Sequence, residues 1–200
     1  MATNASPALW RDTMKQGALR SGAIIGGIVL LLLTLAVAVA LASYHSGDPS
    51  LNTAAAGPAK NLLGDPGAVV ADLLFAIAGV PVVLMLPLGL IFAVRLWSDV
   101  ALGPWQRMLR NAAIGVVLLS LAAALVSGQA VLWLPGGYGG LIGLSLAALV
   151  RWATAFIGDP QAILWTVRGL AAVSGIAGLF LWARALTIRL PRGARLGLDT

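Results

Sequence analysis

Long uncharged apolar stretches alternate with short polar segments along this chain. The first, Gly22–Ala42, has about 20 residues and, at about 1.5 Å of rise per residue, is long enough for the ~30 Å hydrocarbon core of a bilayer. Leu73–Val94 and Ala112–Leu134 are uncharged over a similar length. The pattern predicts a membrane-spanning helix at each of the three.

The second stretch contains Pro81 and Pro87. Each proline removes a backbone N–H donor and crowds the preceding turn of a helix. We therefore expect this helix to be kinked, unless neighbouring groups satisfy the carbonyl oxygens that the prolines free.

A fourth spanning helix is expected near the end of the chain. Only 15 uncharged residues separate Arg168 from Arg184, which is too few to cross the hydrocarbon core. The span must therefore reach back to about Ile163, which leaves Arg168 inside the outer edge, where its guanidinium group can snorkel to the headgroups.

The segment 139–157 is also apolar, but Arg151 lies inside it. A mid-bilayer arginine costs about 2.5–3.5 kcal/mol on the insertion scale. At 100° per residue, Arg151 shares one helical face with Ala147 and Thr154, while Trp152 and Phe156 fall on the other. This arrangement favours a helix that lies in the interface or re-enters the membrane over one that crosses.

Composition supports a membrane protein. Hydrophobic residues make up 60% of the chain and charged residues 10%, more apolar surface than a globule of this size buries. Because cysteine is absent, disulfides and thiolate metal sites are excluded.

The basic residues indicate the orientation of the spans. In a four-span chain most of them fall on one side: Arg11, Lys15, Arg20, Arg95, Arg107, Arg110, Arg184, Arg189, Arg192 and Arg195. Lys60, Arg151 and Arg168 fall on the other. By the positive-inside rule both termini are expected in the cytoplasm.

The predicted fold is therefore all-α, an integral membrane four-helix bundle with a periplasmic loop and an interfacial or re-entrant periplasmic helix. Residues 1–21 form a cytoplasmic segment, residues 22–186 the membrane domain and residues 187–200 the start of a cytoplasmic linker. The expected spans cover about residues 22–43, 73–94, 112–134 and 163–183.

The polar segment from Ser43 to Asp72 interrupts this apolar chain. It is far longer than the 2–8 residues that usually join two packed helices. Turn-forming residues recur along it, for example at Gly47-Asp48-Pro49-Ser50 and Gly64-Asp65-Pro66-Gly67, and each has a backbone reason to favour a turn. We expect a loop that is ordered and folds over the membrane surface.

This loop resembles the first periplasmic loop in the membrane domain of the FtsK/SpoIIIE septal DNA translocases. The matching residues are Tyr44, Asp48, Pro49, Ser50, Asn52, Gly57, Asn61, Gly64, Gly67, Ala68, Ala71, Asp72 and Leu73. Lys60 stands where that family commonly has glycine or alanine. A second stretch, "LPGGYGGLIGLSL" at residues 134–146, is similar to the glycine-rich start of the family's second periplasmic segment.

The resemblance implies a membrane-anchoring, septum-targeting and oligomerising domain of a cell-division DNA translocase in the bacterial inner membrane. Its implied partners are the lipid bilayer, other divisome membrane proteins and further copies of the chain, as a hexamer in the full-length protein. DNA would be handled only by a separate ATP-driven motor domain. The loop would be the partner surface, with Tyr44, His45, Asp48, Pro49, Ser50, Asn52, Asn61 and Asp65 as candidates.

No catalytic, cofactor or metal site is predicted in the chain itself. A phosphate-binding P-loop needs a Gly-Lys pair, and neither Lys15 nor Lys60 follows a glycine. His45 is the only histidine, and no second ligand stands at metal spacing.

Structural roles are predicted for two further sets of residues. Asp72, Arg151 and Arg168 are candidates for ion pairs near the outer membrane face. Gly22 and Gly26 offer a small-residue face for helix packing, by default within the bundle.

Two other functions are weighed. A small membrane transporter or channel subunit would need ionisable groups at mid-membrane, and the first three spans have none. An intramembrane enzyme would need a nucleophile or metal ligands on facing helices. The chain has one histidine and no cysteine, so few residues could serve in such a site. The membrane-anchor function is therefore favoured.

Overall fold

A computed structural model describes residues 7–51, 53–98, 100, 102–127, 134 and 136–186. In this part of the chain every regular element is a helix, which confirms the all-α prediction. The elements in order are α1 (Pro7–Ala42), α2 (Gly64–Ala78), the 3₁₀ helix η1 (Val80–Met85), α3 (Leu86–Trp97), α4 (Trp105–Ser127), α5 (Gly140–Thr154), the 3₁₀ helix η2 (Ala155–Ile157) and α6 (Pro160–Leu186).

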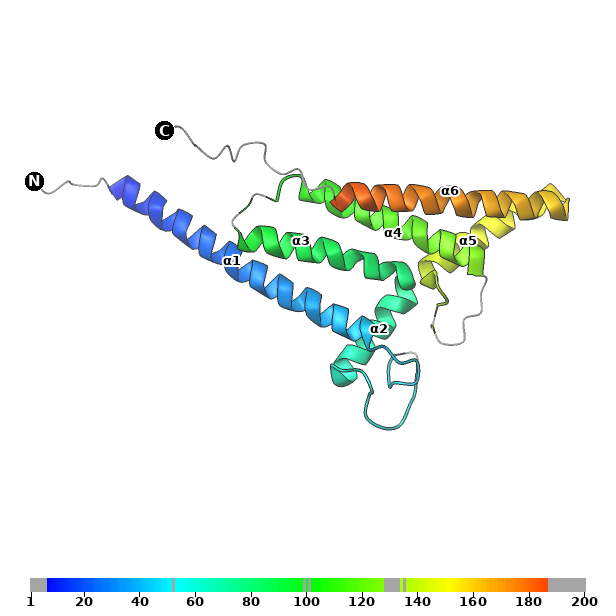
Figure 1. Ribbon diagram of the computed structural model, residues 1–200, viewed down its shortest axis with the longest axis horizontal. Helices are drawn as coiled ribbons and strands as arrows, with labels where there is room; N and C mark the ends of the chain where they lie inside the picture. The colour runs from blue at the N-terminus through cyan, green and yellow to red at the C-terminus, as the bar shows by residue number, and fades with distance from the viewer. Residues whose placement is uncertain are drawn as a thin grey trace, which may run out of the picture.

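The long helices form two antiparallel pairs. α1 packs along α3, and α4 packs along α6 (Figure 1). Buried side chains of α3, α4 and α6 meet in one cluster that contains Leu88, Met108 and Ala185, and this cluster joins the pairs. The first residues of α1 and the last residues of α6 lie at the same end of the bundle (Figure 1).

Five stretches in the described part of the chain are long and apolar enough to cross a membrane. They are Gly17–Ala42, Val80–Trp97, Trp105–Ser127, Gly140–Ile157 and Pro160–Leu186. Four of them overlap the predicted spans, and the fifth is the segment predicted to lie in the interface. The positions of the four spans in a bilayer stay a prediction.

The second apolar stretch is broken, which confirms the kink expected from its prolines. α2 ends at Ala78, and Gly79 takes the left-handed conformation with φ 66°. A 3₁₀ helix and then α3 follow in a new direction. The long apolar helix of this region therefore begins at Val80, not at Leu73 as the sequence pattern indicated.

Side chains from other helices satisfy two carbonyl oxygens at the break. The carbonyl group of Ala78 ends α2 and has no partner within that helix, and Ser120 of α4 donates its hydroxyl there at 2.7 Å. Pro87 has no N–H to continue the 3₁₀ pattern of η1 to the carbonyl oxygen of Leu84, and the indole N–H of Trp182 on α6 donates to that oxygen at 2.7 Å. The break is thus tied to both helices of the other pair.

A glycine-rich turn packs into the break. Gly79 and Gly140 approach so closely that a Cβ on either would collide with the other segment's backbone. Val80 N–H donates to Tyr138 O at 2.9 Å across the same contact. The glycines of "GGYGG" therefore serve close backbone packing, with Gly139 also lying against the carbonyl oxygen of Ser120.

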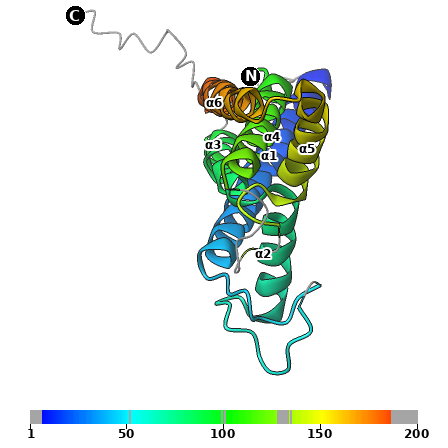
Figure 2. The same cartoon turned by 90° about the vertical axis from the view of Figure 1, so that its right-hand side faces the viewer.

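α5 lies obliquely to the long helices. In Figure 2, α6 is seen nearly end-on, while α5 and α2 are seen along much of their length. Ala147 and Thr154 of α5 are buried, whereas Trp152 and Phe156 are 65% and 77% exposed. The division of α5 into two faces follows the sequence prediction.

Candidate interaction site: the folded cap between α1 and α2

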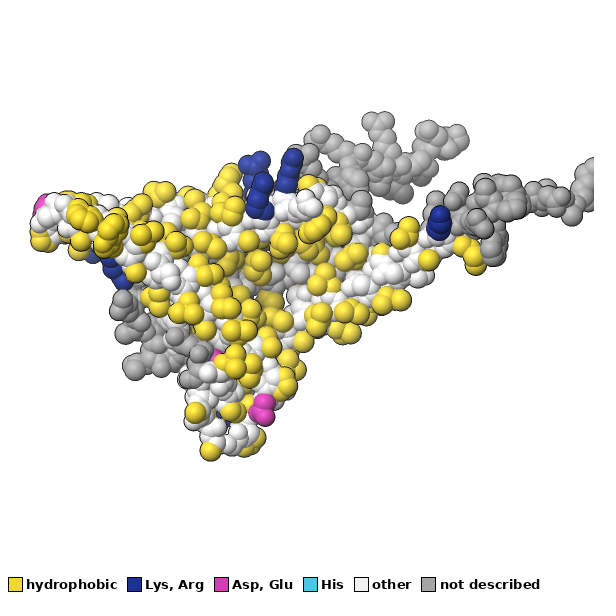
Figure 3. Space-filling model, turned by 180° about the vertical axis from the view of Figure 1, so that it is seen from behind, with side chains coloured by type: hydrophobic (Ala, Val, Ile, Leu, Met, Phe, Trp, Pro, Cys, Tyr) yellow, Lys and Arg dark blue, Asp and Glu magenta, His cyan; other side chains and the backbone are white. Residues whose placement is uncertain are grey.

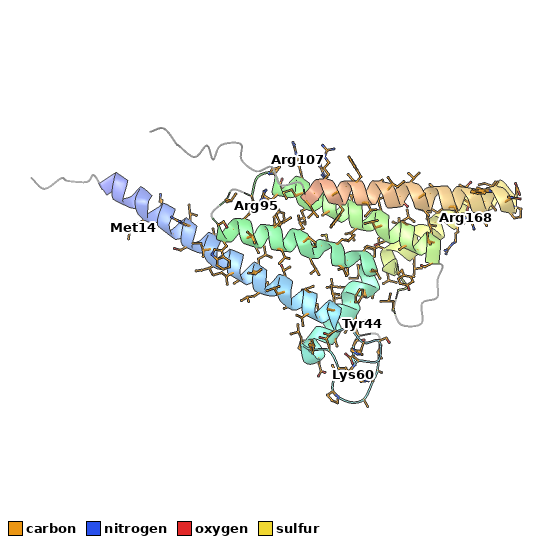
Figure 4. All side chains as sticks on the ribbon, in the orientation of Figure 1. Met14, Tyr44, Lys60, Arg95, Arg107 and Arg168 are labelled. Carbon is orange, nitrogen blue, oxygen red and sulfur yellow. The ribbon has the colours of Figure 1, made fainter. Side chains whose placement is uncertain are left out.

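Residues 43–63, called the cap below, project from the end of the bundle opposite to the start of α1 (Figure 1). Tyr44 and Lys60 lie on the cap, far from Met14 and Arg95 at the other end (Figure 4). Only a few turn bonds join cap backbone to cap backbone, such as Asp48 N–H to His45 O at 3.1 Å. Its order must therefore come largely from side-chain hydrogen bonds.

Asn61 ties the cap to the end of α1. Its side-chain amide donates to the carbonyl oxygens of Ala40 and Ser43, at 2.8 and 3.3 Å, and its Oδ1 accepts the N–H of Leu63 at 3.1 Å. Ala40 lies in the last turn of α1, where carbonyl groups lack a partner within the helix. One buried side chain, 4% exposed, thus caps α1 and starts the turn into α2.

Asp48 closes the cap across its base. Its two carboxylate oxygens accept the backbone N–H groups of Lys60 and Asn61, each at 2.9 Å. The side chain is only 5% exposed. Because hydrogen bonds to a charged acceptor are stronger than neutral ones, Asp48 holds the second half of the cap against the first.

Ser43 and Gly67 complete this network. The Ser43 hydroxyl donates to Val39 O at 2.7 Å and accepts from the N–H of Leu62 at 3.1 Å. A Cβ at position 67 would collide with the Oδ1 of Asn61. Only glycine at that position of α2 leaves room for the asparagine.

Tyr44 connects the cap to α2. Its hydroxyl donates to Oδ1 of Asp72 at 3.3 Å, and its ring packs edge-on to Phe75 with centroids 5.0 Å apart. Burial, and then the negative charge of Asp72, raise the pKa of Tyr44 to about 12. The phenol is therefore neutral, and a donor, throughout the physiological range.

These contacts correct part of the predicted partner surface. Asp48 and Asn61 are buried and bind the cap's own backbone, so they cannot form a docking surface. Tyr44, Pro49 and Ser50 are partly buried, His45 and Asp65 are exposed, and Asn52 lies outside the described residues.

Three exposed leucines of the cap were missed by the sequence analysis. Leu51 is 72% exposed, Leu62 78% and Leu63 41%. Nothing in the sequence singled them out, because isolated exposed leucines are common on protein surfaces.

Among the predicted ion-pair residues, both arginines have partners other than Asp72. Arg151 donates to the carbonyl oxygen of Ala124 at 3.2 Å, near the C-terminal end of α4, where a positive charge is favourable. The guanidinium group of Arg168 lies 5.8 Å from the ring centroid of Trp165. Asp72 is buried beside Tyr44. In these contacts the three residues have different partners, and the ion pairs between them stay a prediction.

The predicted packing glycines also differ from the observed one. A Cβ at Gly22 or Gly26 would meet nothing within 4 Å, so neither packs within the described chain. Gly27 does, since a Cβ there would lie 2.7 Å from the backbone N of Trp97 on α3. The glycine that packs against α3 is therefore the residue after Gly26, and not Gly26 itself.

The described residues contain no group of three histidine, cysteine, aspartate or glutamate side chains that would hold a metal. They define an α-helical integral membrane domain, whose largest polar structure is a cap held by buried asparagine and aspartate side chains. The chain belongs to the family described as the 4TM region of DNA translocase FtsK/SpoIIIE, whose model matches residues 20–187.

Curated relatives agree with this membership. The chain is 31% identical over 182 residues to DNA translocase FtsK of Bradyrhizobium diazoefficiens, a match that covers 88% of this chain and 21% of that protein. It is 29% identical to DNA translocase FtsK of Caulobacter vibrioides, with 78% of this chain and 19% of that protein covered. For the Brucella suis protein of the same name the identity is 38%, over 60% of this chain and 14% of that protein.

The chain thus spans about a fifth of the length of the Bradyrhizobium and Caulobacter proteins. The matched part is the membrane region, and it includes no P-loop motif. No solved structure gives a significant match to the chain.

Proposed function

We propose that this domain anchors, targets to the septum and oligomerises a cell-division DNA translocase, which moves chromosomal DNA through the closing septum. The observation that carries the proposal is the family match over residues 20–187. The names of the relatives supply the translocase activity, which would reside in a motor domain outside these 200 residues. Other divisome membrane proteins are the proposed partners.

The proposed orientation places both termini in the cytoplasm and the cap in the periplasm. It is supported by Arg95 and Arg107, which lie near the termini end of the bundle (Figure 4). Lys15 and Arg20 belong to the first half of α1, Arg110 to the first turns of α4 and Arg184 to the last turn of α6, the parts of these helices nearest that end. Lys60 and Arg168 lie at the opposite end (Figure 4). The positive-inside rule favours this orientation in the inner membrane.

We further propose four spans, formed by α1, by η1 with α3, by α4 and by α6, with α5 in the outer interface. Arg151 supports this arrangement because its guanidinium group binds the end of α4. The exposed aromatic residues Trp152 and Phe156 suit the headgroup region, where aromatic side chains are enriched.

Orientation and the place of α5 are tested together by single-cysteine variants, since the chain has no cysteine. In intact cells an impermeant thiol reagent should label Ser46→Cys on the cap and leave Ser98→Cys at the end of α3 unlabelled. Both positions are exposed, so a reversed pattern contradicts the orientation. Labelling of Ser145→Cys, on the exposed face of α5, supports the interfacial position, and protection supports a fifth span.

The cap is the proposed recognition surface for divisome proteins. Its support is the combination of a rigid hydrogen-bonded base with exposed apolar tips at Leu51 and Leu62. The test is the position of a fluorescent fusion of residues 1–200 in dividing cells. A midcell band that is lost in Leu51→Asp/Leu62→Asp, while that variant stays folded and in the membrane, supports the proposal. Uniform membrane fluorescence of the intact wild-type fusion contradicts autonomous targeting.

Oligomerisation, up to a hexamer in the full-length protein, is the remaining proposed role. Gly22 and Gly26 support it because they leave an uncovered small-residue face on α1. Gly26→Leu should reduce cross-linking between copies without changing thermal stability, while Gly27→Leu should destabilise the monomer through its contact with α3. Unchanged cross-linking of Gly26→Leu would remove α1 from the interface.

A further inference from the structure

Three arginines at the termini end of the bundle differ from the other described arginines. Arg107 and Arg110 on α4 and Arg184 on α6 are exposed, and no hydrogen bond or ion pair joins them to another described residue. By contrast, Arg95 donates to Leu102 O at 3.3 Å, and Arg151 and Arg168 have the partners given above. We call Arg107, Arg110 and Arg184 the arginine cluster.

The cluster is held together by the packing of its two helices. Met108 and Ala112 of α4 share a buried core with Ala185 of α6, so residues next to them in sequence lie at the same level. Farther along the pair, a Cβ at Gly115 would lie 2.9 Å from Gly178 O. Lys and Arg side chains gather on one face over this end of α4 and α6 (Figure 3), and Arg107 points outward there (Figure 4).

Electrostatics make this arrangement unfavourable without an anion. Arg107 and Arg110 stand three residues apart on one helix, a spacing at which like charges repel. They also lie in the first turns of α4, which begins at Trp105, and the N-terminal end of a helix disfavours cations and favours anions. A bound anion would remove both penalties.

The depth of the cluster indicates which anion. Residues 111–127 of α4 and 169–183 of α6 are uncharged, so the cluster lies directly next to the apolar parts of both helices. Two tryptophans, Trp97 at the end of α3 and Trp105 at the start of α4, lie at the same end and are 52% and 45% exposed. Tryptophan is enriched at the membrane interface. The level of the cluster is therefore that of the lipid phosphates.

We propose that Arg107, Arg110 and Arg184 form a binding site for the phosphate of an anionic phospholipid. Guanidinium groups bind phosphate through two parallel N–H bonds, which fixes geometry as well as charge. The site would hold the α4–α6 pair at a defined depth. This proposal does not depend on septal targeting or on which side of the membrane this end faces.

The test uses the 200-residue chain in neutral detergent, with phosphatidylglycerol as the probe and native mass spectrometry as the readout. Arg107→Gln/Arg110→Gln/Arg184→Gln should bind phosphatidylglycerol at least about tenfold more weakly than the wild type, because each surface arginine adds markedly to anionic lipid affinity. Lys15→Gln/Lys60→Gln/Arg168→Gln removes the same charge elsewhere and should stay within about twofold. The triple lysine variant keeps the charge but loses the paired N–H bonds, so its affinity should fall between those of the wild type and the glutamine variant.

Several results would overturn the proposal. Equal losses in the cluster variant and the charge-matched control would mean that net charge alone attracts the lipid. Equal binding of phosphatidylcholine and phosphatidylglycerol would exclude recognition of the anionic headgroup. Displacement of the lipid by a short DNA duplex at physiological salt would assign the cluster to nucleic acid, and displacement by inorganic phosphate would assign it to soluble anions.

Discussion

The hydroxyl group of Ser120 donates a hydrogen bond to the carbonyl oxygen of Ala78 at 2.7 Å, although the two residues are 42 positions apart. Ser120 is completely buried. The bond supplies a donor to a carbonyl oxygen at the end of α2, where the helix itself provides none, so the break inside a very apolar chain leaves no orphan oxygen at this point.

Ser120→Ala should destabilise the domain by about 1–3 kcal/mol, because it leaves a buried carbonyl oxygen without a donor. The measurement is thermal or denaturant unfolding in detergent. Ser127→Ala is the matched control, since the Ser127 hydroxyl bonds only to Ala123 O of its own helix. Equal effects of the two variants would show that the Ser120 bond contributes nothing beyond helix propensity.

Gly79→Ala should prevent correct folding, whereas Gly158→Ala should cost about 1–2 kcal/mol. Both glycines have positive φ, 66° and 76°. A Cβ at Gly79 would collide with the carbonyl oxygen of Tyr138, while one at Gly158 would meet nothing within 4 Å. Yield of monodisperse protein and its melting temperature measure the difference, and similar behaviour of the two would contradict the close approach at the break.

Asn61→Asp should be more harmful than Asn61→Ala. Alanine removes the donor to Ala40 O, whereas aspartate also places a negative oxygen against the carbonyl oxygens of Ala40 and Ser43. Hydrogen exchange of the cap amides should increase in both variants, and more in the aspartate variant. Lys60→Ala, an exposed neighbour, should leave exchange unchanged; if it does not, the cap is loose for another reason.

Tyr44 should make the domain sensitive to alkaline pH. Its pKa is about 12 in the fold and 10.0 in an unfolded chain. Its stabilising contribution is therefore complete below about pH 10 and is lost as the pH rises towards 12, because the unfolded state releases the proton first. Unfolding midpoints between pH 8 and pH 12 should decline less in Tyr44→Phe than in the wild type. If the unfolding midpoints of the wild type and of Tyr44→Phe declined equally with pH, the raised pKa of the Tyr44 hydroxyl would be contradicted.

Much of the fold was predictable because its signals are local. An uncharged run long enough for a bilayer, a proline that lacks an N–H and the two faces of 139–157 are each read from neighbouring residues. The observed helix begins later than residue 73 for the opposite reason. Leu73 and Gly79 belong to one uncharged run, and the end of α2 at Ala78 coincides with the positive φ of Gly79 and its packing against the 136–140 turn, which no local pattern shows.

The cap was predicted as an ordered loop, and the exposure of two of its polar residues was misjudged. Asp48 and Asn61 look like surface residues because polar residues in loops usually are. They proved to be internal, since their hydrogen-bond partners lie at Lys60 and Ala40, positions that no local pattern connects. The same limit explains Gly22 and Gly26: a motif gives a spacing, but the neighbour of a face depends on how α1 is rotated against α3.

By itself the sequence determined the all-α membrane class, the approximate apolar stretches and the family, because hydrophobicity and motif order accumulate along the chain. Tertiary structure alone decided which polar groups meet. Ser120, Trp182 and Arg151 each donate to a carbonyl oxygen of another helix, and Asn61 of the cap donates to one of α1. An apolar interior makes an unpaired carbonyl costly, so these distant pairings complete the fold, and they exist only once the helices have packed.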